Sequence, residues 1–410
     1  MIKRDLYLDK IRPLIGKDII KVLTGIRRCG KSSILHLIIE ELIESGVSED
    51  NIILINFESA KYSEIESYKE LNKLIEKLTH NLEGTKYLFF DEVQNVKHWE
   101  KSINACRVDL DSQIFITGSN ANLLSGELST LIAGRYIEIK IYPFSFKEAL
   151  ELNESFKKAL ELNKNFKDIG ERDFFMEYLT YGGMPFVLHL EINEKIKYLK
   201  DLYNSIILKD VIQKNKIREL DLFDKVIKFL MDNLGRTFSA KSISDYFKSE
   251  NRTLSRETIY NYLVYLQEAC LIHKVQREDL IGKKLLKIHE KYYFTDHGFN
   301  ETITGKNTKR IAQILENIVY MEFLRRGYEI YVGKLNGLEI DFICKNHEKT
   351  VYVQVSYLLA SEETITREFK PLLKIKDNYE KILITMDELD FSEKGIKHFN
   401  IIDFLKSNDF

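Results

Sequence analysis

The sequence predicts an α/β protein that begins with a parallel β-sheet and continues with three further segments. Five short apolar runs in the first third alternate with amphipathic helical stretches, which is typical of a parallel sheet covered on both faces. Further along, three helical stretches precede two strand-like runs, and the last hundred residues alternate helix and strand. We therefore predict domains at residues 1–150, 151–215, 216–300 and 301–410.

The composition is that of an ordinary globular protein, with 44% hydrophobic and 30% charged residues in a chain of 410. Lysine and arginine number 61 against 63 aspartates and glutamates, so a basic surface for nucleic acid has to be local. No uncharged apolar run is long enough to cross a bilayer, and the four cysteines lack metal-ligand spacing. We expect a cytoplasmic protein with no membrane segment and no structural zinc.

Polar residues follow several of the predicted strands. The strands are expected at residues 19–23, 51–57, 87–90, 113–117 and 136–141. Lys31 follows the first strand, Asp91 the third, and Ser119 with Asn120 the fourth. Because ligands of parallel sheets bind beyond the carboxyl ends of the strands, we expect these side chains to meet at one edge.

The segment between the first strand and the first helix fits the pattern G-x-x-x-x-G-K-[ST] at every fixed position. It consists of Gly25, Ile26, Arg27, Arg28, Cys29, Gly30, Lys31 and Ser32. Backbone N–H groups of such a loop converge on phosphate oxygens, and the following helix adds its positive dipole end. We expect Lys31 to reach the β- and γ-phosphates, Ser32 to bind Mg²⁺ and Ser33 to join the nucleotide-binding set. The loop therefore predicts ATP with magnesium as ligands.

Two adjacent acids end the third strand. We expect Asp91 to hold the magnesium shell and Glu92 to polarise the attacking water; the alternative is a solvated turn. Either Ser119 or Asn120 can position that water, and the sequence leaves both open. Arg135 precedes the fifth strand, where it is either an arginine finger directed at a neighbouring subunit or an ordinary surface arginine.

Together these motifs resemble the AAA-type P-loop ATPases, and more narrowly a bacterial and archaeal group whose loop reads G-x-R-R-x-G-K-S. Further matching segments lie at residues 89–94, 117–119, 134–135 and 143–148. The resemblance implies a P-loop NTPase fold, nucleotide contact at Lys31 and Ser32, magnesium contact at Asp91 and a catalytic role for Glu92. AAA-type enzymes often place the site between subunits, so the resemblance favours a homo-oligomer.

Residues 151–215 are predicted to be mostly helical, with a sharp turn at the glycines and proline of residues 181–185. A lid over the nucleotide and a packing connector are both open interpretations. From residue 216 onward, three helices followed by a strand pair are the order of a winged helix-turn-helix.

In a winged helix the third helix enters a DNA groove. The candidate contacts are Arg252, Arg256, Asn261, Lys283 and Lys284. Residues 236–291 hold eleven lysines and arginines against seven aspartates and glutamates, a mild positive excess. Because winged helices also dock proteins, duplex DNA and a protein partner both remain open.

The last segment carries an acid on a helix, Glu316, and another in a strand, Asp341, followed by Gln354 and Ser356 on the next strand. This is the layout of a restriction-endonuclease-like metal site. The segment also resembles the domain of unknown function that follows the ATPase core in the same group. The nuclease motif needs an acid, any residue, then lysine, whereas this chain has Gln354, Val355 and Ser356. We therefore predict an inactive, structural or DNA-holding domain.

The sequence thus predicts an ATP hydrolase that acts as a nucleotide switch on a partner, for which duplex DNA is one candidate. Two other classes remain open: an ATP-dependent nuclease, and an ATP-binding signalling or scaffold protein that docks other proteins. The missing carboxylate and lysine at Gln354 and Ser356 count against the nuclease.

Overall fold

The chain is described here as a computed structural model. The described residues are 2–120, 123, 132–160, 170–237, 239–249, 254–282, 284–305 and 310–408. They form two compact units, one of residues 1–143 with 268–270 and one of residues 144–267 with 271–410. Among the described helices, none has the length and apolar character that crossing a membrane requires.

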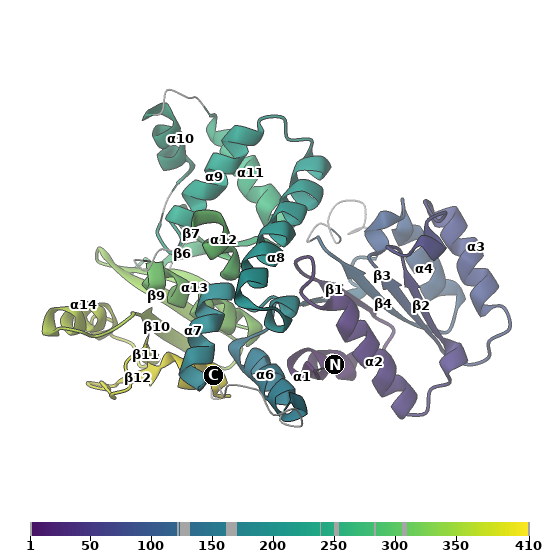
Figure 1. Cartoon of the computed structure of the whole chain (residues 1–410), viewed down its shortest axis with the longest axis horizontal. Helices are drawn as coiled ribbons and strands as arrows, with labels where there is room; N and C mark the ends of the chain where they lie inside the picture. The colour runs from purple at the N-terminus through teal and green to yellow at the C-terminus, as the bar shows by residue number, and fades with distance from the viewer. Residues whose placement is uncertain are drawn as a thin grey trace. The chain divides into compact units, whose positions relative to one another are not determined.

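The first unit is built on a five-stranded sheet in the order β2-β3-β4-β1-β5 (Figure 1). Its strands are β1 (Ile20–Thr24), β2 (Ile52–Asn56), β3 (Lys86–Asp91), β4 (Ser112–Gly118) and β5 (Tyr136–Lys140). Its helices are α1 (Asp5–Ile11), α2 (Lys31–Glu44), α3 (Tyr68–Thr79) and α4 (Trp99–Asp109). Short 3-10 turns lie at Arg12–Leu14, Glu49–Asn51, Ala60–Tyr62 and Val93–Asn95. Every pair of neighbouring strands is parallel, which confirms the predicted sheet.

Helices cover both faces of this sheet, with α1 and α2 on one side and α3 and α4 on the other (Figure 1). The central strands are apolar on both faces for this reason. Phe90 packs with Leu71 of α3 and Ile103 of α4 in one core. On the opposite face the rings of Phe89 and Phe115 stack with centroids 4.5 Å apart. The ends of the strands are therefore held on a rigid frame.

The strand order decides which strand ends become neighbours. β4 lies between β1 and β3, with Gly118 paired to Thr24 and Ile116 paired to Phe90. The segments that follow β1, β3 and β4 therefore emerge at the same carboxyl edge, which confirms the expectation that their polar residues meet there.

The second unit begins with helices, as predicted for residues 151–215. They are α6 (Phe146–Leu160), α7 (Glu171–Tyr181), a 3-10 turn (Pro185–His189), α8 (Ile192–Ser205) and a π-helical segment (Ile206–Gln213). Both α7 and α8 pack against α12 (Gly298–Thr304). These helices are thus integral to the second unit.

The predicted turn at Gly182 and Gly183 is held by a buried carboxylate. Asp296 accepts the backbone N–H of Gly183 at 2.9 Å and that of Gly298 at 2.8 Å. Gly182 has φ +76°, and a Cβ there would lie 1.9 Å from Asp296 Oδ1. Only glycine fits this close approach, because any side chain would displace the carboxylate.

Three helices and a hairpin follow in the predicted order. They are α9 (Leu220–Asp232), α10 (Ala240–Ser249), α11 (Arg256–Glu268), β6 (Ile272–Asp279) and β7 (Lys284–Phe294). Ser239 is the N-cap of α10, because its Oγ accepts the N–H of Ser242 at 3.2 Å. The two strands pair antiparallel from Ile272 with Phe294 to Asp279 with Lys284.

The hairpin differs from the separate wing that we predicted. It belongs to a seven-stranded sheet in the order β12-β11-β10-β9-β8-β6-β7. The other strands are β8 (Glu329–Leu335), β9 (Leu338–Lys345), β10 (Thr350–Val355), β11 (Glu380–Thr385) and β12 (Ile396–Asn400). The helices of this part are α13 (Ile311–Arg325), α14 (Glu362–Leu373) and α15 (Ile401–Lys406).

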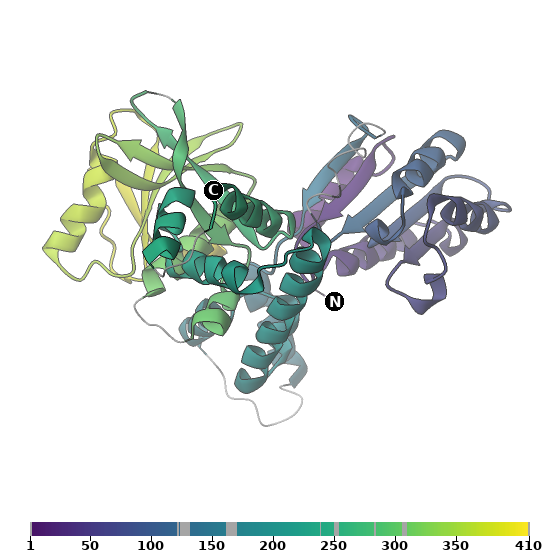
Figure 2. The same cartoon turned by 90° about the horizontal axis from the view of Figure 1, so that it is seen from above.

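Arg277 to Asp279 of β6 pair with β8, so the hairpin joins the sheet through these residues; Figure 2 shows the strands of this sheet in green to yellow. A strand edge presents unpaired N–H and C=O groups, and here β8 supplies partners for that part of β6. The boundary expected at residue 300 therefore falls within one continuous sheet.

Candidate functional site

The loop of residues 25–32 joins β1 to α2, as predicted, and two glycines shape it. Gly25 has φ +152°, and a Cβ there would lie 2.1 Å from the carbonyl oxygen of Ile141. Gly30 has φ +101° and is the N-cap of α2. The side chains of Ile26 and Cys29 are fully buried, so these residues can contact a ligand only through their backbone. The loop thus lies at a helix N-terminus, where an anion is favoured.

Lys31 is the first residue of α2, and its side chain is only 3% exposed. Its ammonium donates to the carbonyl oxygens of Gly25 at 3.1 Å and Ile26 at 3.3 Å, and lies 3.5 Å from Glu92 Oε1. Burial works against the charge, but the electrostatic interactions with Cys29, Glu92 and Asp91 leave the pKa of Lys31 above its ordinary value. The site therefore holds a permanent ammonium beside the loop, able to exchange carbonyl oxygens for phosphate oxygens.

Asp91 ends β3 and is 2% exposed. Its Oδ1 accepts the hydroxyl of Thr117 at 2.5 Å and its Oδ2 accepts the amide of Asn56 at 3.0 Å. Burial raises the pKa of Asp91, and hydrogen bonds from Thr117 and Ser32 offset part of that shift. The predicted magnesium ligands, Ser32 and Asp91, are thus in direct contact. A carboxylate and a hydroxyl suit Mg²⁺, which binds few protein oxygens and keeps several waters.

Glu92 has a left-handed backbone, with φ 55°, and its N–H donates to the Thr117 hydroxyl at 2.9 Å. Burial would raise the pKa of its carboxyl, but the Lys31 ammonium and hydrogen bonds from Gln94 and Ser119 hold it below the ordinary value. Glu92 is therefore a carboxylate at neutral pH, and it can orient a water molecule and accept its proton.

Ser119 and Asn120 follow β4 and are both buried at the same edge. Gln94 Nε2 lies 2.5 Å from Glu92 Oε2 and 3.5 Å from Ser119 Oγ, so it bridges these two side chains. Ser119 thus belongs to the hydrogen-bond network around Glu92, while Asn120 is buried directly after it.

The structure does not bring every predicted residue into this cluster. Arg135 is exposed and donates to Asn104 Oδ1 at 3.4 Å. It precedes β5, whose first residue Tyr136 pairs with Ile20 at the start of β1, so it lies at the opposite edge of the sheet. Arg135 therefore cannot act on the site of its own chain; action on a second copy remains a prediction.

The other two arginines of the predicted set belong to the loop itself, and the last serine of the set follows the loop directly. Arg27 forms an ion pair with Glu58 at 3.2 Å, and Arg28 is exposed with φ 67°. Ser33 lies in the first turn of α2 and is half-buried. Their contacts with a nucleotide stay predictions.

Sequence reasoning missed three residues of this site. Asn56 ends β2 and holds Asp91, and Gln94 bridges Glu92 and Ser119. Asn56 could have been found by the rule that located Asp91, because both are polar residues at the end of a buried strand. The third, Arg4, is 2% exposed and donates to the carbonyls of Cys29 and Tyr142, each at 2.9 Å. It precedes every motif, and no local pattern marks it.

In the second unit the predicted acids, Glu316 of α13 and Asp341 of β9, are neighbours of a buried lysine that sequence reasoning also missed. Lys291 Nζ lies 2.8 Å from Glu316 Oε1 and 3.7 Å from Asp341 Oδ1. Gln354 donates to Glu368 of α14 at 3.1 Å. Ser356 follows β10, and its backbone N–H donates to Ile384 O. Among the described residues, no group of three or more carboxyl, thiol or imidazole side chains is arranged to hold a metal ion.

The AAA domain matches residues 17–150, and a domain of unknown function (DUF8612) matches residues 172–310. An uncharacterized protein of Haemophilus influenzae is 39% identical over 406 residues, which cover 99% of this chain and 98% of the relative. The uncharacterized protein MJ1544 of Methanocaldococcus jannaschii is 30% identical over 412 residues, covering 97% and 90% respectively.

Among solved structures, the Walker-type ATPase PABY2304 of Pyrococcus abyssi is similar, with a TM-score of 0.53 at 16% identity. The match covers 74% of this chain and 96% of that one, and at this identity it shows a shared fold alone. The five-stranded parallel sheet, the loop before α2 and the AAA-domain match agree with one another. The chain therefore belongs to the same family as the Haemophilus influenzae protein and MJ1544, and its residues 17–150 match the AAA domain.

Proposed function

We propose that this chain is a magnesium-dependent ATP hydrolase whose catalytic site lies in the first unit. One observation carries the proposal: a buried ammonium, a hydroxyl in contact with a buried carboxyl group, and an ionised carboxylate converge at the end of one sheet. These are Lys31, the Ser32–Asp91 pair and Glu92. A solvated turn would leave the two acids exposed, whereas Asp91 is buried and fully hydrogen-bonded.

Each residue has a distinct part in the proposed reaction. Lys31 exchanges its bonds to the Gly25 and Ile26 carbonyls for the β- and γ-phosphates. Ser32 and Asp91 hold magnesium, which when bound neutralises charge on the phosphates. Glu92 orients a water molecule and accepts its proton as the water oxygen bonds to the γ-phosphorus. The bond from that phosphorus to the bridging oxygen breaks, and ADP and phosphate leave.

The test uses the purified full chain with ATP and magnesium. Calorimetry is expected to show one nucleotide bound per chain, and phosphate release is expected to stop when EDTA removes the magnesium. The proposal fails if the chain neither takes up MgATP nor releases phosphate from it. If the chain binds MgATP but releases no phosphate, the nucleotide-binding site is supported and the proposed hydrolase activity is contradicted.

We further propose that nucleotide state in the first unit controls how the second unit engages duplex DNA. The succession of α9, α10, α11 and the β6–β7 hairpin has the order of a winged helix-turn-helix. Three of the candidate contacts, Arg256, Asn261 and Lys284, are exposed on α11 and β7. Arg252 and Lys283 lie outside the described residues. The order α13-β8-β9-β10-α14-β11 supports a restriction-endonuclease-like module next to it.

Replacing Arg256 by glutamate is expected to weaken duplex DNA binding about tenfold. The slope of the logarithm of the binding constant against the logarithm of salt concentration is expected to become shallower by the amount that corresponds to about one phosphate contact. Fluorescence anisotropy at several salt concentrations measures both quantities. Lys376→Glu is the matched control, because Lys376 is an exposed lysine outside the hairpin and helices α9 to α11. Equal binding by wild type and Arg256→Glu would contradict the proposed contact. If the wild-type protein does not bind duplex DNA, a protein partner is favoured for the same surface.

A further inference from the structure

Lys291 is a buried lysine surrounded by carboxylates. It lies in β7, its side chain is 1% exposed, and three carboxylates from two other elements face its ammonium. The distances from Nζ are 2.8 Å to Glu316 of α13, 2.9 Å to Glu339 of β9 and 3.7 Å to Asp341 of β9. Although burial opposes the charge, these carboxylates hold the pKa of Lys291 above its ordinary value. The ammonium therefore remains charged inside the cluster.

The oxygens that a divalent ion would need are already engaged by donors of the chain. Glu316 Oε1 accepts both Lys291 Nζ and, at 2.5 Å, the hydroxyl of Tyr293. Asp341 Oδ2 accepts the N–H of Val355 at 2.9 Å, while its Oδ1 faces Lys291. Glu339 also lies 3.4 Å from Arg277 of β6. Glu316 Oε1 and Glu339 Oε1, the two oxygens nearest to Lys291, thus already interact with its ammonium, which has three N–H donors.

Two cations lie within this cluster, each beside one of its carboxylates. Glu316 and Glu339 face the cations Lys291 and Arg277. Removing Lys291 would leave buried carboxylates without their main counter-charge.

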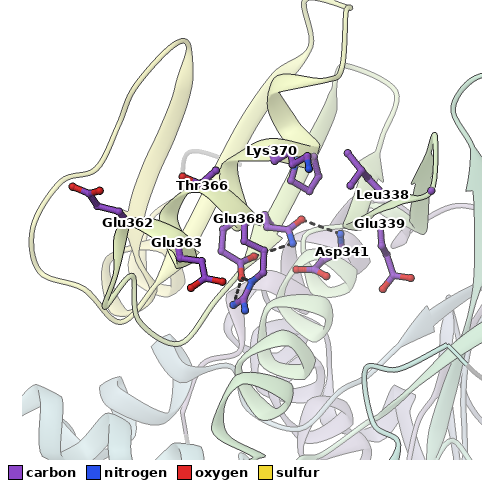
Figure 3. Close-up of a pocket in the computed structure, with 12 residues that line it drawn as sticks. Leu338, Glu339, Asp341, Glu362, Glu363, Thr366, Glu368 and Lys370 are labelled. Atoms are coloured by element: carbon purple, nitrogen blue, oxygen red, sulfur yellow. Dashed lines mark hydrogen bonds and ion pairs between the residues drawn. The ribbon is translucent and has the colours of Figure 1, made fainter.

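A pocket of about 810 Å³ gives solvent a route to the same cluster. Glu339 and Asp341 of β9 and Glu368 of α14 line it (Figure 3). Gln354 also lines the pocket and is bonded to Glu368. Small ions can therefore reach the carboxylates of β9 from outside, and Lys291 lies on their inner side, since it is nearly inaccessible to solvent.

We propose that Lys291 is a built-in cation that fills the place of a divalent ion among Glu316, Glu339 and Asp341. The wild-type cluster then takes up no divalent ion, and replacing Lys291 by a neutral residue converts it into a divalent-cation site. A lysine that activates water beside a metal would need carboxylate oxygens free to bind that metal, whereas here the ammonium itself occupies them. This inference concerns the second unit and does not depend on ATP hydrolysis.

The experiment compares nucleotide-free full-length wild type with Lys291→Met, a neutral side chain of similar length. In EDTA the variant is expected to melt roughly 10 °C lower, because buried carboxylates lose their counter-charge. Adding Mn²⁺ is expected to recover most of that loss in the variant and to leave the wild-type Tm unchanged. Calorimetry is expected to show one more Mn²⁺ per chain in Lys291→Met than in wild type. The additional Asp341→Asn substitution is expected to abolish that binding.

Lys345→Met is the matched control, because Lys345 ends β9 and pairs with Glu278 at 2.7 Å outside the cluster. It should gain no Mn²⁺ site. Wild type and Asp341→Asn should bind equal amounts of Mn²⁺, and this comparison decides the question even if Lys291→Met fails to fold. Mn²⁺ uptake or Mn²⁺-dependent DNA cleavage by wild type that Asp341→Asn abolishes would overturn the proposal. A folded Lys291→Met that gains no Mn²⁺ would do so as well.

Discussion

Replacing Glu92 by glutamine should lower ATP hydrolysis by about a thousandfold while ATP still binds. The carboxylate is ionised because Lys31, Gln94 and Ser119 hold its pKa below the ordinary value, whereas an amide cannot accept a proton from water. Glutamine keeps the shape of the side chain, so the loop and Asp91 should stay in place. Phosphate release under single-turnover conditions measures the loss, and calorimetry measures the remaining affinity.

The control for this substitution is Glu49→Gln, because Glu49 is an exposed glutamate of the 3-10 turn that precedes β2. Its hydrolysis rate should equal that of wild type. If Glu92→Gln hydrolyses ATP as fast as wild type, Glu92 takes no part in the reaction and another group accepts the proton. Loss of ATP affinity alongside hydrolysis would instead indicate that the substitution disturbs the loop.

Replacing Lys31 by alanine should weaken ATP binding by at least about a hundredfold, because a buried ammonium that faces the loop is lost. Lys31→Arg should not restore binding, since the planar guanidinium is larger than the ammonium and the site around Lys31 is closed. Titration calorimetry with MgATP measures both variants. Hydrolysis should fall with binding in each of them.

Removing Lys31 also leaves Glu92 without its positive partner, so the melting temperature has to be followed in parallel. Lys73→Ala, an exposed lysine of α3, is the control and should bind ATP like wild type. A folded Lys31→Ala protein that binds MgATP with wild-type affinity would contradict the assignment of residues 25–32 as the phosphate-binding loop.

The ATPase fold and much of its site could be predicted because both depend on local patterns. The strands of the first unit are short apolar runs, and a polar residue after such a run is placed by the sheet itself. Asp91 and Ser119 were found in this way, and Asn56 obeys the same rule. Arg135 fits a motif equally well, yet it precedes its strand and lies at the other edge.

The remaining features depend on contacts between distant segments, which no local pattern reports. Lys291 and Asp341 are brought together by β7 and β9, although the two strands are not neighbours in the sheet. The junction of β6 with β8 extends one sheet across a predicted boundary for the same reason. A lysine in an alternating strand is ordinarily a surface residue, so nothing in the sequence around Lys291 indicates that it is buried.

The short segment around α1 has a practical consequence for anyone who excises the ATPase module. The match to the AAA domain begins at residue 17. Arg4 nevertheless donates to the carbonyls of both Cys29 and Tyr142, a clamp on the loop, and the Tyr142 N–H donates to the hydroxyl of Tyr7 at 3.1 Å. A fragment that starts where the similarity starts would keep every signature residue and lose this clamp. Its loop would then be free to sample shapes that do not fit a triphosphate, and weak binding by such a fragment would misrepresent the intact chain.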